Sequence, residues 1–508
     1  MEISLYDAIA FGLFLLVVVG VSLYASRREK DSEDYFLAGR NLTWWLIGFS
    51  LIASNISTEH FVGMAGSGFG SLGLAVASYE WVAAITLVVT GLFLLPLYLK
   101  MGIYTMPEFL EYRYGQKARM VMAIFLMVAY VGVAIAAVLY SGALGLQTIF
   151  GLDMTSGIWL IGLIAGAYTM YGGLKAVVWS DLIQGAALLI GGIIITILGF
   201  NAVGGVGEFF TANEDKLHMI LPADHPDIPW TAFFLGMWIP NFFYWGFNQF
   251  ITQRTLGAKT LAHGQNGIMF AAIIKLIMPF IIVFPGIMAY QLYGSEITNG
   301  DQAYPLLIKN LLPTGLRGIM MAALFGAVMS SLDSMLNSAS TIFTMDIYKR
   351  HLNKTANQQR VVKVGRIATG VLIIIGCLVA PLPARFEGVF AYIQMIWGFI
   401  SPGIVCVFFF GLAFRRAPES ASVAAMLAGI PIYGLFLYYL PDMAFLNHMG
   451  FTFIILCLIM TAFTLLQPLP EPVVFKAQSN VELKTGPLPK ILAVFVVIMT
   501  IILYIIFW

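Results

Sequence analysis

The 508-residue sequence predicts an all-α polytopic membrane protein with about fourteen transmembrane helices, arranged as two inverted five-helix repeats that contain broken helices. Three observations predict this fold: the composition, the number of long apolar segments, and two apolar segments that polar residues interrupt. Hydrophobic residues make up 60% of the chain and charged residues 10%, whereas soluble domains are about 25% charged. We therefore expect nearly the whole chain to lie in a lipid bilayer.

The apolar segments define the expected helices, because an apolar stretch of about 20 residues crosses the hydrocarbon core. Their centres lie near residues 15, 58, 87, 134, 163, 190, 244, 277, 331, 372, 400, 428, 458 and 498. The first segment lacks a small-residue cleavage site and is followed by charged residues, so we expect a retained helix rather than a signal peptide.

The distribution of basic residues predicts the orientation. The net charge of +1 gives no general basic field that would indicate nucleic acid binding. If the N-terminus is outside, most of the 27 Lys and Arg residues, including Arg254 and Lys259, fall in cytoplasmic loops. The positive-inside rule then places both termini outside a plasma (inner) membrane that the chain crosses many times. The three cysteines lie in apolar segments and are expected to pack there.

Two segments are interrupted in a way that the others are not. Residues 50–61 read SLIASNISTEHF, and residues 238–250 read WIPNFFYWGFNQF, where Pro240 removes a backbone donor. Interruptions at corresponding positions of two halves indicate a transporter's binding site. The expected divisions are an extra helix and loop (1–43), repeat 1 (44–204), an external loop (205–229), repeat 2 (230–414) and three C-terminal helices (415–508).

Ionisable residues inside membrane segments are functional candidates by default, because insertion costs about 2.5–3.5 kcal/mol for a charge at a helix centre. The sequence places Glu59, Glu80, Asp181, Lys275 and Asp333 in such segments, with His60 beside them. One buried ion pair that locks helices would explain some of these residues. It would not explain so many in five segments.

Small and hydroxyl residues recur at helical spacing around residue 331 and form one face of that helix. Such a face often serves close helix packing. Together with backbone carbonyls freed where residues 53–57 unwind, the hydroxyls of Ser330 and Ser331 would instead form an all-oxygen shell. Neutral oxygen ligands suit a weakly held hard cation, for which sodium is the natural candidate.

A second polar set predicts a small-molecule site. Its polar members are Asn55, His60, Glu80, Asn241, Lys275 and Gln394, and its aromatic members are Tyr79, Trp81, Tyr244, Trp245 and Phe390. Convergent polar groups in an aromatic cavity are typical of ligand sites, although each aromatic taken singly is better explained by packing. Because Glu80 and Lys275 offset one another in charge, a neutral ligand rich in hydroxyls is favoured.

Long motifs throughout the chain resemble the sodium/solute symporter family, and within it the sodium–glucose cotransporter branch, with the bacterial sodium/galactose symporters most similar. The motifs are SEDYFLAGRNLTWW (32–45), ASYEW (77–81), GIYTMPEFLEYRY (102–114), YGGLKAVVWSDLIQ (171–184), NFFYWGFNQFITQRTL (241–256), SSLDSMLNSASTIFTMDIYK (330–349) and FAYIQ (390–394). The resemblance implies a LeuT-like fold with a 5+5 inverted repeat.

The resemblance also implies roles for individual residues. The sodium site would use the carbonyls of Ala53, Ile56 and Ala327 and the hydroxyls of Ser330 and Ser331. The sugar site would use Asn55, His60, Glu80, Asn241, Trp245, Lys275 and Gln394, with Phe390 beside them and Tyr244 as an inner gate that stacks on the sugar ring. A sodium exit path or second sodium site would involve Asp181, Asp333 and Ser334.

Several positions depart from the bacterial galactose symporters, so the galactose assignment does not transfer. His60 stands where they have Gln, Ala83 where they have Ser, Ala134 where they have Asn, and Asp333 where they have a small or hydroxyl residue. The number of sodium ions, one or two, therefore stays open.

The expected function is sodium-coupled import of a neutral hexose such as glucose or galactose by alternating access. The alternative is a polyol such as myo-inositol or another small solute, while a channel or sensor is disfavoured. We expect no enzymatic activity, no organic cofactor and no obligate protein partner. The expected partners are sodium, sugar and the lipid bilayer.

Overall fold

The computed structural model describes residues 4–27, 31–57, 59–150, 152–382 and 389–508, and these ranges contain helices and connecting segments but no β-strand. The elements before the external loop are α1 (Leu5–Ser26), α2 (Ser32–Leu37), η1 (Ala38–Arg40), α3 (Trp44–Asn55), η2 (Glu59–Met64), α4 (Ala65–Phe69), η3 (Gly73–Ala77), α5 (Ser78–Val89), η4 (Thr90–Leu94), α6 (Leu95–Met101), α7 (Met106–Arg113), α8 (Gln116–Ala129), η5 (Tyr130–Ala134), α9 (Ile135–Phe150) and α10 (Met154–Ala202).

The remaining elements complete the bundle. They are α11 (Val206–Ala212), η6 (Glu214–Lys216), α12 (Trp230–Leu235), α13 (Trp238–Phe242), η7 (Phe243–Phe247), α14 (Gln249–Leu256), α15 (Leu261–Tyr293), η8 (Gly300–Gln302), α16 (Ala303–Leu311), α17 (Leu316–Ile342), η9 (Phe343–Leu352), α18 (Gln358–Val379), α19 (Val389–Ala413), α20 (Glu419–Tyr439), α21 (Phe445–Leu466) and α22 (Leu488–Ile506).

All fourteen predicted membrane segments are helical in the described residues. Within the described residues, eleven helices are long and apolar enough to cross a membrane. One of them, α10, covers two predicted segments because it bends at Gly173, whose φ of 50° and ψ of −152° are not helical. A Cβ at Gly173 would also lie 2.3 Å from the carbonyl oxygen of Tyr35, so only glycine fits this bend. The other two predicted segments are the broken helices.

The first broken helix ends where the sequence predicts it. α3 stops at Asn55, and Ile56 takes an extended backbone conformation with φ −72° and ψ 107°. The chain resumes at Glu59 in the wide helical turn η2, which leads into α4. The polar residues of this stretch therefore do interrupt a membrane helix.

The second broken helix differs from the prediction in its position. Pro240 lies inside α13, and the helix continues through the wide turn η7 as far as Phe247. The break comes at Asn248, whose φ of −85° and ψ of 127° are extended. Pro240 stands near the start of its helix, where few backbone N–H groups need an intrahelical acceptor, so it is tolerated there.

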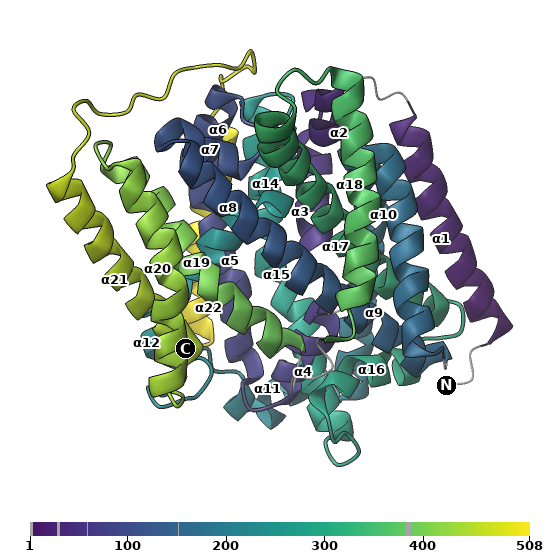
Figure 1. The fold of residues 1–508 in the computed structure, drawn as a ribbon. Coiled ribbons are helices and arrows are strands. Elements are labelled where there is room, and N and C mark those ends of the chain that lie inside the picture. Colours follow the sequence, from purple (N-terminus) through teal and green to yellow (C-terminus); the bar gives the residue numbers. More distant parts are fainter. Residues whose placement is uncertain (1–3, 28–30, 58, 151, 383–388) are drawn as a thin grey trace.

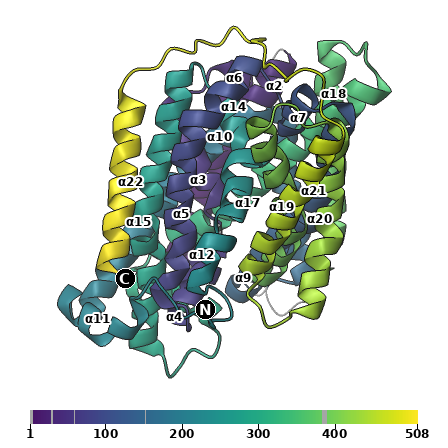
Figure 2. The same cartoon turned by 90° about the vertical axis from the view of Figure 1, so that its left-hand side faces the viewer.

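The long helices form one bundle with both described chain ends on the same face (Figures 1 and 2). α17 and α15 are the most buried of the membrane-crossing helices, since 89% and 78% of the residues in their most apolar stretches are buried. In α1 the corresponding share is only 11%. The C-terminal helix α22 packs beside α15 and α5 (Figure 2). In that contact the ring of Tyr504 lies edge-on to Trp81, with 5.5 Å between ring centroids.

The structure corrects the predicted position of Arg254. Arg254, which the basic-residue pattern places in a cytoplasmic loop, lies in α14 and is 1% exposed. It stays in the interior because buried oxygen atoms surround its guanidinium, and these are described with the site.

Candidate functional site

A cavity of about 130 Å³ lies between the two broken helices. Six residues of the predicted sugar set line the cavity, namely Asn55, His60, Glu80, Asn241, Tyr244 and Trp245. They come from the first break, α5, α13 and η7, so the fold brings together segments that are distant in the sequence.

The polar groups of the wall form a continuous chain of contacts. Lys275 on α15 donates to Glu80 at 2.6 Å and also to the side-chain oxygen of Asn55. Nε2 of His60 lies 3.4 Å from the other carboxylate oxygen of Glu80. The side-chain nitrogen of Asn55 donates to the hydroxyl of Tyr244 at 3.1 Å. One buried ion pair therefore orders both His60 and the predicted inner gate Tyr244.

Lys275 is fully buried, and its ammonium lies 5.0 Å from the ring centroid of Trp245. This distance allows a cation–π attraction in addition to the ion pair with Glu80. The remaining polar member, Asn241, donates to the carbonyl of Met237 in its own helix at 2.9 Å.

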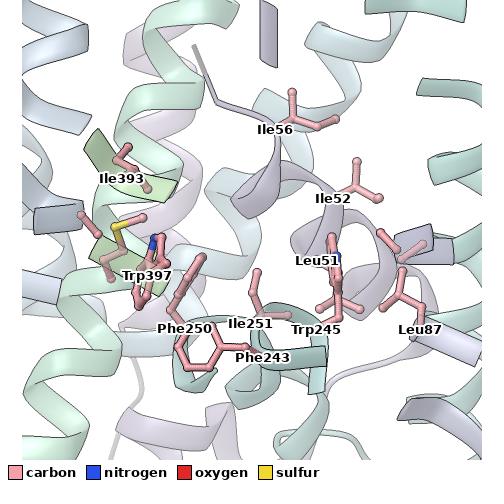
Figure 3. Packing of buried hydrophobic residues seen from close by; sticks show 14 of the residues in the cluster. Leu51, Ile52, Ile56, Leu87, Phe243, Trp245, Phe250, Ile251, Ile393 and Trp397 are labelled. Carbon is pink, nitrogen blue, oxygen red and sulfur yellow. The ribbon is translucent and has the colours of Figure 1, made fainter. Parts of the chain in front are cut away.

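Apolar and aromatic side chains complete the cavity wall. Ile393 and Trp397 project from α19, and both line the cavity with Phe250 of α14 (Figure 3). Phe243 packs against Trp397 with 5.1 Å between ring centroids. Tyr244 lies 5.2 Å from the ring of Phe250, perpendicular to it. The cavity thus has a polar side near Lys275 and an aromatic side near α19.

The break after α3 also frees a backbone carbonyl. In a continuous helix the N–H of Ser57 would bond to the carbonyl of Ala53. It is directed instead at Nδ1 of His60, 3.5 Å away, while the N–H of Ile56 still bonds to the carbonyl of Ile52 at 2.8 Å. The Ala53 carbonyl therefore fits the role of a sodium ligand that the resemblance gives it.

The two predicted hydroxyl ligands, Ser330 and Ser331, lie on α17 beside the last turn of α3. Ser331 donates to the backbone carbonyl of Ser54 at 3.4 Å and also lines the cavity. Ser330 donates to Asp181 at 2.5 Å, which leaves the lone pairs of its oxygen available to a cation. Ala327 lies one turn earlier in α17 and is fully buried. Of the predicted sodium ligands, Ser331 thus also belongs to the cavity wall.

A buried network of polar side chains surrounds Asp181 and includes Ser330. Asp181 is fully buried and accepts from Ser50 at 2.5 Å and from Ser54 at 3.1 Å, in addition to Ser330. Arg254 lies 3.4 Å from the same carboxylate and donates to Ser50 at 2.6 Å. Arg254 offsets the charge of Asp181, which explains why both residues are tolerated in the interior.

The two remaining members of the predicted second path separate in the structure. The hydroxyl of Ser334 lies 3.0 Å from that of Ser54 and contacts Arg254, so it belongs to the Asp181 network. Asp333 points to α10, where it accepts from Tyr168 and, at 2.7 Å, from Thr169. Asp333 therefore does not join the group in which the sequence analysis placed it.

Several cavity residues were missed by the sequence analysis. Ser57, Glu59, Phe250, Met335 and Trp397 all line the cavity. Glu59 was noted as an intramembrane charge but was not assigned to the site. The aromatic and Met residues carried no signal, because apolar side chains are expected in any membrane segment. The side chains of Phe390 and Gln394 lie outside the described residues.

Comparisons with known proteins agree with this architecture. The sequence model of the "Sodium:solute symporter family" matches residues 35–429. A "Sodium/glucose cotransporter" from Vibrio parahaemolyticus is 42% identical over 494 residues, which cover 91% of this chain and 90% of the relative. A "Sodium/myo-inositol cotransporter 2" from Mus musculus is 35% identical over 465 residues, covering 84% and 68% of the two chains.

Solved structures show the same fold at lower identity. A Na⁺-coupled sialic acid symporter in a substrate-bound outward-open state superposes with a TM-score of 0.83 at 24% identity, covering 93% of this chain and 99% of the other. The nucleobase-cation-symport-1 family transporter Mhp1 superposes with a TM-score of 0.59 at 14% identity, covering 87% and 97%. These neighbours have the LeuT-like fold that the family resemblance implies. The chain is a sodium-coupled symporter rather than an enzyme, and it belongs to the sodium:solute symporter family.

Proposed function

We propose that this symporter imports a neutral monosaccharide, such as a glucose- or galactose-like hexose, together with sodium. The observation that carries the proposal is the chain of contacts from His60 through Glu80 and Lys275 to Asn55 and Tyr244 around one cavity. Such a wall offers several fixed donors and acceptors to the hydroxyls of a sugar. The 42% identical sodium/glucose cotransporter supports the same class of substrate.

The charges of the wall favour a neutral ligand. The ammonium of Lys275 is neutralised by Glu80 at 2.6 Å, and Glu59 adds a further carboxylate to the cavity. An anionic ligand would meet no unpaired cation among the described lining residues. This argues against a sugar acid such as sialic acid, although a sialic acid symporter has the same fold.

Sodium would bind between the Ala53 carbonyl and the hydroxyls of Ser330 and Ser331, beside the sugar. Entry into the cell would follow the membrane potential, which supplies about 2.3 kcal/mol per charge per 100 mV. At about 1.36 kcal/mol per tenfold ratio, one sodium ion sustains roughly a fiftyfold sugar gradient. With both termini outside an inner membrane, as the basic residues predict, Tyr244 would control release to the cytoplasm.

A second candidate substrate is a polyol such as myo-inositol, which the 35% identical inositol cotransporter favours. Asp333, fully buried against Tyr168 and Thr169, lies on the α10 side of α17, so it does not discriminate between the two substrates.

Labelled glucose, galactose and myo-inositol uptake into proteoliposomes tests the proposal. We expect one of the hexoses to accumulate under an inward sodium gradient and not under a potassium gradient of equal size. Preferential accumulation of myo-inositol would show that the substrate is the polyol rather than a hexose. Sodium-dependent uptake of sialic acid in preference to both would overturn the argument from the charges of the wall.

A further inference from the structure

A second hollow lies on the surface of the bundle, between α1 and the first half of α10. Its volume is about 540 Å³, and its lining residues are Val19, Leu23, Ile164, Ala167, Tyr168 and Tyr171. α1 and α10 stand beside each other at the edge of the bundle (Figure 1). Because most of α1 is exposed, this groove faces the acyl chains of the bilayer.

One end of the groove carries two arginines. Arg366 of α18 donates to the carbonyl of Tyr171 at 3.1 Å, and its guanidinium lies 5.7 Å from the ring of that residue. Arg27 directly follows α1 and lies 3.7 Å over the ring of Tyr24. α1 and α10 touch at this end, since a Cβ added to Gly172 would lie 2.4 Å from the hydroxyl of Ser26. Both guanidinium groups therefore stand near the same end of the groove.

The arginines lack anionic partners within the described part of the chain. The salt bridges found there involve neither Arg27 nor Arg366. The Nε atom of Arg366 is also buried without a hydrogen-bond acceptor. Arginine is suited to phosphate, which accepts two parallel hydrogen bonds from one guanidinium.

We propose that the groove between α1 and α10 is a binding site for an anionic phospholipid of the surrounding bilayer. One acyl chain lies along Leu23 and Tyr168, and the phosphate lies at Arg366 and Arg27. An apolar groove with positive charge at one end matches the polarity of such a lipid and of no soluble anion. Basic residues beside a membrane helix attract anionic head groups in the same way.

The site has a structural link to the transport machinery. Tyr168 lines the groove with its ring and donates its hydroxyl to Asp333 of α17. Asp333 is fully buried and follows Ser330 and Ser331 on the same helix. A lipid chain in the groove therefore packs against the side chain that ties α10 to α17.

Lipid binding to the purified full-length protein tests this proposal, measured by native mass spectrometry during titration with dioleoylphosphatidylglycerol or dioleoylphosphatidylcholine. We expect one phosphatidylglycerol to bind more tightly than phosphatidylcholine. Arg366→Gln and Arg27→Gln should each weaken phosphatidylglycerol binding about fivefold. Arg360→Gln is the matched control, because Arg360 lies on α18 but is exposed and bonded to the hydroxyl of Tyr348.

A second pair of variants separates the groove from its charged end. Ala167→Phe fills the groove from α10 and should weaken phosphatidylglycerol binding, whereas Ala462→Phe on the exposed face of α21 should not. Thermal unfolding of each variant without added lipid identifies any change in folding, and Arg366→Lys keeps the charge if Arg366→Gln unfolds.

Equal affinity for the two lipids, or equal losses in Arg360→Gln and Arg366→Gln, would overturn the proposal. An unchanged affinity in Ala167→Phe would also overturn it, because the phosphate would then bind without the groove.

Discussion

Replacing Lys275 by methionine tests the ion pair at the centre of the cavity wall. Lys275 is fully buried, and its ammonium donates to Glu80 at 2.6 Å and to the side-chain oxygen of Asn55. Methionine keeps much of the length and volume of lysine but removes the charge and all donors. The Glu80 carboxylate, with a side chain only 4% exposed, is then left without a cation.

The size of the effect follows from this burial. Removing one partner of a buried ion pair costs about 3–5 kcal/mol, because the other charge stays desolvated and unpaired. A typical domain is stable by about 5–15 kcal/mol, so the variant should unfold at a clearly lower temperature. The double variant Lys275→Met, Glu80→Leu removes both charges and should recover most of the lost stability. Neither variant should transport sugar, because both lack the Lys275 ammonium that holds the side chain of Asn55 in the cavity wall.

The assays are thermal unfolding of the purified proteins and sodium-driven sugar uptake into proteoliposomes. Stability that falls in the single variant and returns in the double variant, with uptake absent from both, is the expected result. A double variant as unstable as the single one would show that the ion pair is not the cause of the loss. Normal uptake by the double variant would show that Glu80 and Lys275 are not needed for sugar binding.

Three further variants test the other parts of the site. Ser331→Ala should raise the sodium concentration for half-maximal uptake about tenfold, through the loss of one oxygen ligand; an unchanged sodium titration would contradict the proposed cation site. Tyr244→Phe loses only the hydroxyl that bonds to Asn55 at 3.1 Å, so KM for sugar should rise a few-fold, about 1 kcal/mol, and a complete loss of uptake would instead indicate a larger role for that hydroxyl. His60→Gln should change the ratio of uptake between competing hexoses by about tenfold or more, and identical competition curves would show that His60 does not set selectivity.

Much of this architecture was predictable because polar groups are expensive in a membrane. The interruption at residues 50–61 and the intramembrane pair of Glu80 and Lys275 both stand out against apolar neighbours. The structure places the break at Ile56 and brings the pair within 2.6 Å. These features need no tertiary information to be noticed, since their cost is evident from the local sequence alone.

Other features depend on tertiary contacts that a sequence does not display. The sequence predicts a loop position for Arg254 because this residue follows a polar stretch, yet its side chain is buried beside Asp181. Pro240 is the more obvious helix breaker, but the break comes at Asn248. Phe250 and Trp397 reach the cavity only because the fold brings α14 and α19 to it. In each case the decisive fact is which helix packs against which.

The last turn of α3 contacts both the proposed sodium site and the proposed sugar site. Ser54 offers its carbonyl to Ser331 and its hydroxyl to Asp181, while the next residue, Asn55, contacts Lys275 and Tyr244. Successive residues of a helix point about 100° apart, so one turn serves two networks. The extended backbone at Ile56 interrupts the helix directly after this turn, and a ligand that orders the turn for one network also orders it for the other. Coupling of this kind is reciprocal: the factor by which sodium raises the affinity for sugar must equal the factor by which sugar raises the affinity for sodium.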